Sequence, residues 1–316
     1  MKKRTDLAFL FPGQGSQAMG MLSELAARHA VVQKTFIEAS AALGEDLWQL
    51  ASAGPESLLN RTDHTQPLML TAGIAVWRAW REGGGALPNR MAGHSLGEYS
   101  ALVAAGALDF PVAVELVRDR GRYMQAAVPE GEGAIAAVLG IDDTRLAALC
   151  EDNADGEVVE PVNYNAPGQT VIAGHRGAVE RTLDAAREAG AKKAVMLPMS
   201  VPAHCSLMAP AAEQLAARLA DVPLREPDVP VLHNVDVSLS ADPDAIRQRL
   251  IAQVHSPVRW TECIQALAAD GIEQAVECGP GRVLAGLNRR IDRRMNIQAI
   301  HDPDSLAKAL NTLEVE

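Results

Sequence analysis

A five-residue stretch, Gly93-His94-Ser95-Leu96-Gly97, constrains the fold of this chain more than any other part of the sequence. A short apolar stretch precedes it, and the small apolar side chains that follow predict a helix up to Ala105. Gly-x-Ser-x-Gly between a strand and a helix is the pattern of a nucleophile elbow. Because glycine has no Cβ, the backbone can bend sharply there and the strand and helix can approach closely. The pattern therefore predicts Ser95 at the tip of a tight turn.

The start of the following helix suits a reacting centre. The backbone N–H of Leu96 is expected to face the same space as the Ser95 hydroxyl, at the positively polarised end of the helix. Such a donor can stabilise the negative oxygen of a tetrahedral intermediate. A plainer alternative is that Ser95 only caps the helix, which serine often does.

The order of apolar runs predicts an α/β fold with a mostly parallel sheet. The first run, Leu7 to Phe11, is continuous and ends at a turn, as in a strand that is buried on both faces. Helical segments separate it from the remaining candidate strands of the sheet. These candidates are the stretch before Gly93, Val229 to Asn234, Glu273 to Cys278 and Asn296 to Ile300. A largely buried helix is expected to start at Thr65, and the residues after Ile300 are expected to form a fraying tail.

The turn after the first strand has more than one interpretation. Gly13, Gly15 and Ala18 satisfy a loose dinucleotide-binding fingerprint, which would favour a nucleotide-binding module. That fold needs a second strand with an acidic end about 20 residues further on, whereas the segment from Val31 to Leu43 has a helical period. Alternatively, Gln14 carries a polar amide just beyond a buried strand, where open α/β sheets place ligands. An ordinary surface turn is the third possibility.

Residues 128–197 predict a small inserted subdomain. The order of elements is strand, helix, two hairpin-forming strands, helix and strand, which is the ferredoxin-like arrangement. The expected ranges are 134–139, 143–153, 158–165, 169–173, 178–189 and 194–197. The chain is thus expected to form a large subdomain from residues 1–127 and 198–316, with residues 128–197 as the insertion.

Composition excludes several classes of partner. The formal net charge of −11 argues against nucleic acid or an anionic membrane surface. No stretch approaches the ~20 apolar residues of a membrane span, and the apolar run after the basic start Met1 to Arg4 is too short for a signal peptide. The four scattered cysteines show no metal-ligand spacing. We expect a cytoplasmic protein with reduced thiols and no metal site.

Five motifs together resemble those of the malonyl-CoA:acyl carrier protein transacylases, over essentially the whole chain. They occur in that family's order and rough spacing, and they are Phe11-Pro12-Gly13-Gln14-Gly15-Ser16-Gln17, Gly93 to Tyr99, Arg120-Gly121-x-x-Met124, Val201-Pro202-x-His204 and Glu277-x-Gly279-Pro280. The resemblance implies an α/β-hydrolase-like core that carries the ferredoxin-like insertion. It also implies a serine acyltransferase.

The resemblance assigns roles to the residues around the elbow. Ser95 would be the nucleophile and His204 its general base, although a lone histidine between apolar residues is more often structural. Gln253 would stand where hydrolases have an acidic residue, and either its side-chain or its backbone carbonyl could hold the imidazole N–H. The N–H groups of Leu96 and Gln14 would form the oxyanion hole.

Arg120 would bind the carboxylate of a malonyl group, although arginines on a helix are usually solvated. His94, Met124 and Asn165 are further pocket candidates. The implied substrates are malonyl-CoA and the phosphopantetheine thiol of an acyl carrier protein, which are used in turn in a ping-pong cycle of fatty acid biosynthesis. No cofactor, nucleic acid or membrane is expected, and the chain is expected to act as a monomer.

Docking of an acidic carrier protein to this acidic chain requires a local basic surface. Two clusters are candidates, and an ordinary solvated surface is the alternative for both. The clusters are Arg187, Lys192 and Lys193, and Arg289, Arg290, Arg293 and Arg294.

Three other functions use some of the same features. A serine esterase or thioesterase would use the elbow with water as acceptor, but it would leave Arg120 buried without an anion. A non-enzymatic carrier-protein or nucleotide-binding module is supported only by the glycine turn. A malonyl-transferring subunit of a malonate decarboxylase complex would need the same site.

Overall fold

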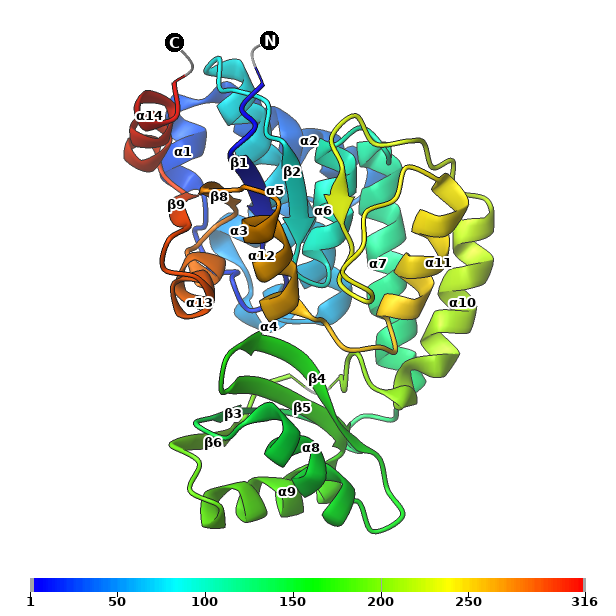
Figure 1. Cartoon of the computed structure of the whole chain (residues 1–316). Coiled ribbons are helices and arrows are strands. Elements are labelled where there is room, and N and C mark those ends of the chain that lie inside the picture. The colour runs from blue at the N-terminus through cyan, green and yellow to red at the C-terminus, as the bar shows by residue number, and fades with distance from the viewer. Residues whose placement is uncertain (1–2, 200, 315–316) are drawn as a thin grey trace.

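The protein is described by a computed structural model that covers residues 3–199 and 201–314. Two sheets organise it (Figure 1): a five-stranded sheet in a large lobe and a four-stranded sheet in a small lobe. The small lobe lies at one end of the large lobe, so that the chain leaves the large lobe after α7 and returns to it after β6.

The large sheet has the strand order β7-β2-β1-β8-β9, and all neighbouring strands are parallel. Its strands are β1 (Leu7–Phe11), β2 (Arg90–Gly93), β7 (Val231–Leu232), β8 (Gln274–Cys278) and β9 (Asn296–Ile300). The parallel arrangement predicted from the apolar runs is therefore confirmed. Because Phe11 pairs with Gly93, the turn after β1 and the elbow after β2 emerge side by side.

Alternate side chains of β1 enter two separate cores. Phe9 packs edge-on against Trp77, with ring centroids 5.0 Å apart, in the core beneath α2, α5 and α7. Ala8 and Leu10 face the opposite core, beneath α12 and α13, where Trp260 is fully buried. Helices on both faces explain why β1 is apolar at every position.

Many helices surround the large sheet. They are α1 (Ser23–Arg28), α2 (Ala30–Leu43), α3 (Leu47–Ala53), α4 (Glu56–Leu59), α5 (Thr62–Glu82), α6 (Gly97–Ala104), α7 (Phe110–Ala127), η1 (Ser206–Met208), α10 (Ala209–Ala220), α11 (Pro243–Gln253), α12 (Trp260–Ala269), α13 (Val283–Ile291) and α14 (Pro303–Thr312). None of the helices in the described ranges has both the length and the apolar composition that crossing a membrane requires.

The small lobe has the predicted order of elements. They are β3 (Gly133–Leu139), α8 (Asp143–Asp152), β4 (Val159–Ala166), β5 (Gln169–His175), α9 (Arg176–Glu188) and β6 (Lys193–Met196). The sheet order is β4-β5-β3-β6, and all neighbouring strands are antiparallel. Backbone hydrogen bonds between Val162 and Val258 and between Tyr164 and Val258 join β4 to the large lobe.

Three element predictions need correction. The helix expected from Thr65 begins at Thr62, because bonds from Arg61 and His64 to the Asp63 carboxylate hold its first turn. Pro67 lies in the second turn of this helix, and because it has no N–H the helix lacks one backbone hydrogen bond there.

The strand expected from Val229 to Asn234 is reduced to Val231–Leu232. Pro230 has no N–H to pair, and Asn234 turns away from the sheet to bond the elbow. The segment after Ile300, expected to be a fraying tail, forms α14, with a capping box between Asp302 and Ser305.

Candidate active site

The elbow has the strained geometry that its sequence predicts. Ser95 has a φ of 52°, in the left-handed region, which costs a non-glycine residue about 1–3 kcal/mol. A Cβ on Gly93 would lie 1.9 Å from the Gly97 carbonyl, and a Cβ on Gly97 would lie 1.9 Å from the carbonyl oxygen of Phe11. Only glycine fits at these two positions.

His204 lies within hydrogen-bond distance of the Ser95 hydroxyl. Its Nε2 is 2.7 Å from Ser95 Oγ, and its Nδ1 is 2.7 Å from the backbone oxygen of Gln253. Because a carbonyl oxygen can only accept, Nδ1 carries the proton and Nε2 is free to accept the proton of the hydroxyl. The sequence did not decide whether the side-chain or the backbone oxygen of Gln253 accepts from the imidazole N–H. In the structure it is the backbone oxygen.

The surroundings of His204 keep its imidazole neutral. The ring is buried, and burial, together with the positive charge of Arg120, lowers its pKa to about 3. At neutral pH the imidazole can therefore act as a base.

Arg120 brings a buried positive charge to the same place. The residue is 1 % exposed. Its Nη1 donates to Gln66 Oε1 at 2.7 Å, and its Nη2 is 3.1 Å from Gln253 Oε1 and 3.3 Å from Ser95 Oγ. Within residues 3–199 and 201–314 no carboxylate forms an ion pair with it, and its Nε has no partner. Since a buried charge without a directly bonded counter-ion is costly, this guanidinium suits an anionic ligand.

A small cavity of about 160 Å³ opens over Ser95. It is below the ~300–1,000 Å³ of pockets for drug-sized ligands, and so suits a short acyl group. Most of the residues predicted for the site line it, namely Gln14, His94, Ser95, Met124, Asn165 and His204. His94 Nε2 is 2.7 Å from Asn165 Oδ1, which fixes one wall between the two lobes.

The two predicted oxyanion donors come from the elbow and from the turn after β1. Leu96 follows Ser95 in the chain, and Gln14 lies in the turn that emerges beside the elbow. Among the hydrogen bonds of the described residues, neither backbone N–H has an acceptor. Both are thus available to a ligand oxygen.

Three buried polar residues of the site were not predicted. Gln66 holds Arg120, Asn234 Oδ1 accepts from the Ser95 N–H at 2.7 Å, and Glu98 bonds the side chain of Gln253. The sequence signals for these three residues were weak. Gln66 is an amide in a largely apolar helix, Asn234 follows a strand, and Glu98 is an acid in the first turn of a helix, where acids are common.

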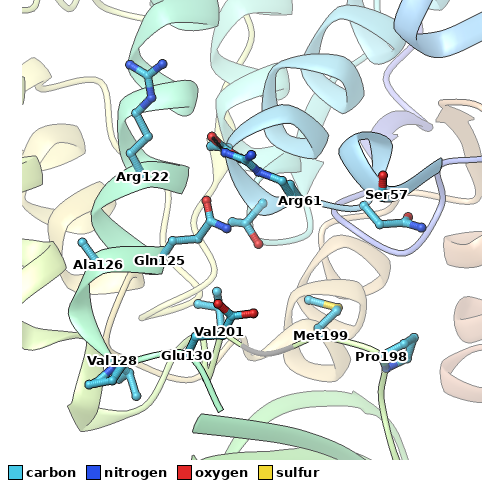
Figure 2. A pocket seen from close by; sticks show the side chains of 14 residues that line it. Ser57, Arg61, Arg122, Gln125, Ala126, Val128, Glu130, Pro198, Met199 and Val201 are labelled. Carbon is cyan, nitrogen blue, oxygen red and sulfur yellow. Dashed lines mark hydrogen bonds and ion pairs between the residues drawn. The ribbon is translucent and has the colours of Figure 1, made fainter. Parts of the chain in front are cut away.

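A larger cavity, of about 880 Å³, lies beside this site but does not contain the serine or the histidine (Figure 2). Arg61 and Arg122 line it, but the Arg61 guanidinium is bound to Asp63 at 2.8 Å. Met199 lines both cavities. Within the described residues no group of acids, histidines and cysteines could hold a metal ion, and all four cysteines are buried free thiols.

A strained serine, a neutral imidazole and a guanidinium without an ion pair in the described part of the chain are the features expected of an acyl-transfer site on an α/β sheet. Comparison with known proteins agrees. The chain belongs to the acyl transferase domain family, whose pattern matches residues 8–298.

Similar proteins cover the whole chain. The malonyl CoA-acyl carrier protein transacylase of Salmonella typhimurium is 54% identical over 306 residues, which cover 97% of this chain and 99% of that protein. The solved transacylase of Coxiella burnetii has 48% identity and a TM-score of 0.97, and covers 100% of this chain and 99% of its own. A malonyl-transacylase solved in complex with a type II PKS acyl-carrier protein has 50% identity and a TM-score of 0.96, with coverage of 97% and 99%.

Proposed function

We propose that this chain transfers a malonyl group from malonyl-CoA to the phosphopantetheine thiol of an acyl carrier protein, through a malonyl ester of Ser95, in fatty acid biosynthesis. The names of similar proteins support the substrates. The single observation that carries the choice of acyl group is the buried guanidinium of Arg120, which lies 3.3 Å from Ser95 Oγ and has no carboxylate partner among the described residues.

The reaction proceeds in two halves. In the first, His204 Nε2 takes the Ser95 proton while Oγ attacks the thioester carbonyl carbon. The carbon–sulfur bond then breaks, and the departing coenzyme A sulfur receives that proton. In the second half, His204 takes the proton of the carrier thiol, whose sulfur attacks the Ser95 ester. The ester bond breaks and Ser95 Oγ recovers the proton.

Arg120 selects the acyl group. Its guanidinium binds the free malonyl carboxylate, and a hydrogen bond to a charged group contributes about 1.5–3 kcal/mol. Gln66 and Gln253 hold the guanidinium with neutral amide oxygens, which do not compete with the substrate carboxylate as a protein carboxylate would. The carbonyl of Gln253 replaces the acid of a serine triad for the same reason, because a carboxylate beside His204 would repel the substrate.

The N–H groups of Leu96 and Gln14 form the oxyanion hole. One such donor is typically worth ~10²–10³ in rate. His94, Met124 and Asn165 line the acyl pocket beside them, and burial lowers the pKa of His94, so that it adds no charge there.

The two lobes correspond to an α/β-hydrolase-like core of residues 1–127 and 198–316 and a ferredoxin-like subdomain of residues 128–197. The sheet orders and the βαββαβ order of the small lobe support this division. The acyl cavity is lined from both lobes, by Ser95 on one side and Asn165 on the other. The chain would act as a cytoplasmic monomer, without nucleic acid or membrane partners.

A comparison of loading from malonyl-CoA and from acetyl-CoA tests this function. Replacing Arg120 by alanine should slow loading from malonyl-CoA by about 10–100-fold, since the contacts to the carboxylate are lost, while loading from acetyl-CoA is retained or gained. Arg118→Ala is the matched control, because that arginine lies on the same helix but contacts the Leu43 backbone oxygen instead. Equal losses for both acyl groups in the Arg120 variant would show that Arg120 is only structural.

The choice of acceptor separates the alternatives. With carrier protein present, the loaded enzyme should lose its acyl group mainly to the carrier thiol. Release mainly as free malonate would instead identify a thioesterase. Transfer only to the carrier subunit of a decarboxylase complex would identify that relative.

A further inference from the structure

We propose that Glu98 is a positioning residue whose buried carboxylate fixes two parts of the site. It holds the elbow in place through Asn234, and it holds the Arg120 guanidinium in place through Gln253. This inference rests on the proposed function and assigns the control of rate and of acyl selectivity to separate hydrogen bonds.

Glu98 lies in the first turn of α6 and is fully buried. Its Oε1 accepts from His233 Nδ1 at 2.7 Å. Its Oε2 accepts from the Asn234 N–H at 3.0 Å and from Gln253 Nε2 at 2.8 Å. Three donors face this side chain, and no lysine or arginine of the described residues pairs with it. Both carboxyl oxygens of Glu98 thus act as hydrogen-bond acceptors.

The first arm of the network, through Asn234, holds the elbow. The Asn234 side chain accepts from the Ser95 N–H at 2.7 Å and donates to the Gly93 carbonyl oxygen at 2.8 Å, so one amide spans the bend. The bend is strained at Ser95, and these two bonds stabilise it. Because the bend places both Ser95 Oγ and the Leu96 N–H, this arm affects every acyl group equally.

The second arm, through Gln253, holds the guanidinium. Gln253 Nε2 donates to Glu98 Oε2 and to the Ser95 carbonyl oxygen, at 2.8 and 3.0 Å. These acceptors fix which way the amide faces, so that its Oε1 points at Arg120 Nη2. In the opposite orientation two donors would face each other. The neutral amide thus stands between the carboxylate and the guanidinium.

This spacing has a chemical consequence. If Glu98 touched Arg120 directly, the protein's own ion pair would occupy the donors that bind the substrate carboxylate. With Gln253 between them, the positive charge has a buried counter-charge nearby, yet the N–H donors that Gln66 and Gln253 do not use remain available. The second arm therefore affects acyl groups that carry a carboxylate more than those that do not.

The test compares loading rates of Ser95 from malonyl-CoA and from acetyl-CoA in three variants. Loading of the unchanged protein by malonyl-CoA tests the proposed function, whereas the pattern among the variants tests this inference. Asn234→Ala should slow both substrates by the same factor, on the order of 10–100-fold, because the nucleophile is misplaced. Gln253→Met keeps the backbone oxygen for His204 but should lower the malonyl-to-acetyl rate ratio about tenfold. Glu98→Gln should show both changes.

The matched control is Thr182→Ala. Thr182 is equally buried, but it lies in the small lobe, where its hydroxyl donates to the Ala178 carbonyl oxygen. Thermal unfolding of every variant separates loss of folded protein from loss of rate, and misfolding cannot change the ratio of two substrates. An unchanged ratio in Gln253→Met, or a changed ratio in Asn234→Ala, would overturn the proposal. These two variants can overturn the proposal even if Glu98→Gln does not fold, and a folded Glu98→Gln that loads both substrates at unchanged rates would overturn it as well.

Discussion

At the scale of single residues, the environment of His204 determines how the reaction depends on pH. Burial and the charge of Arg120 lower its pKa from an ordinary 6.5 to about 3. The general base therefore stays unprotonated far below neutral pH. In kcat/KM for loading from malonyl-CoA, the acid limb reports this group in the free enzyme. We expect no loss of rate from protonation of His204 between about pH 7 and about pH 5.5.

Replacing Arg120 by glutamine should move that limb to higher pH, since a positive charge that opposes protonation is removed. A limb near pH 6.5 in the unchanged protein would contradict the assignment of His204.

The lowered pKa of His204 also affects the stability of the unchanged protein. Unfolded His204 binds a proton below about pH 6.5, whereas in the folded protein it does not until about pH 3. This group therefore lowers the free energy of unfolding as the pH falls across that range.

Sequence reasoning reached some of these residues and not others. Ser95 follows from its own neighbours, because a glycine on each side of the bend has few other uses. His204 and Arg120 lie far from Ser95 in the chain, and only the resemblance to a family connected them. Glu98, Asn234 and Gln66 were missed because their role depends on partners that the fold brings together. A buried acid of this kind has the same local sequence as an exposed acid at a helix start.

At the scale of elements, a single buried acid fixes α13, which carries part of the acyl cavity. Glu277, in β8, accepts from the N–H groups of Leu284 and Ala285 at 3.0 and 2.8 Å. These donors at a helix N-terminus have no partner within the helix. Leu284 and Leu287 of this helix line the cavity over Ser95.

Replacing Glu277 by alanine should lower the free energy of unfolding by about 1–3 kcal/mol, because two buried N–H groups lose their acceptor. Urea unfolding measures this, with Glu273→Ala as the control, since Glu273 is exposed near the start of the same strand. Equal stability of the two variants would show that Glu277 does not hold the helix.

The elements themselves were predictable where their signals are local. β1 was placed from its continuous apolar run, and the small lobe from its alternation of strands and helices. α14 was missed although Asp302 and Pro303 form an ordinary helix start. A helix of 10 residues is marginal alone, and the buried positions of Leu306 and Ala309 show that packing stabilises it.

At the scale of the whole molecule, we predict that the carrier protein docks at the boundary between the lobes. Arg290, in the cluster at α13, donates to Gln169 of the small lobe at 2.6 Å, so this cluster borders both lobes (Figure 1). Arg289 and Arg293 are exposed. In the cluster of Arg187, Lys192 and Lys193, the guanidinium of Arg187 already pairs with Asp184. Because Arg294 of the α13 cluster pairs with Asp292 in the same way, it is the contact with both lobes that makes the α13 cluster the better candidate.

Charge reversal tests this surface. Arg289→Glu combined with Arg293→Glu should raise KM for the carrier protein about tenfold or more, while loading from malonyl-CoA stays within about twofold, because a charge on the surface is screened over ~8–10 Å. Arg145→Glu, on the outer helix of the small lobe, is the control. If KM for the carrier protein is unchanged in the double variant, another surface receives it.

The central claim is that Ser95, activated by His204, carries the malonyl group. Intact-protein mass spectrometry after mixing with malonyl-CoA tests it most directly. We expect the unchanged protein to gain the mass of one malonyl group, Ser95→Ala to gain none, and a carrier protein bearing its phosphopantetheine thiol to remove the adduct. A malonyl adduct on Ser95→Ala, or none on the unchanged protein, would contradict the claim.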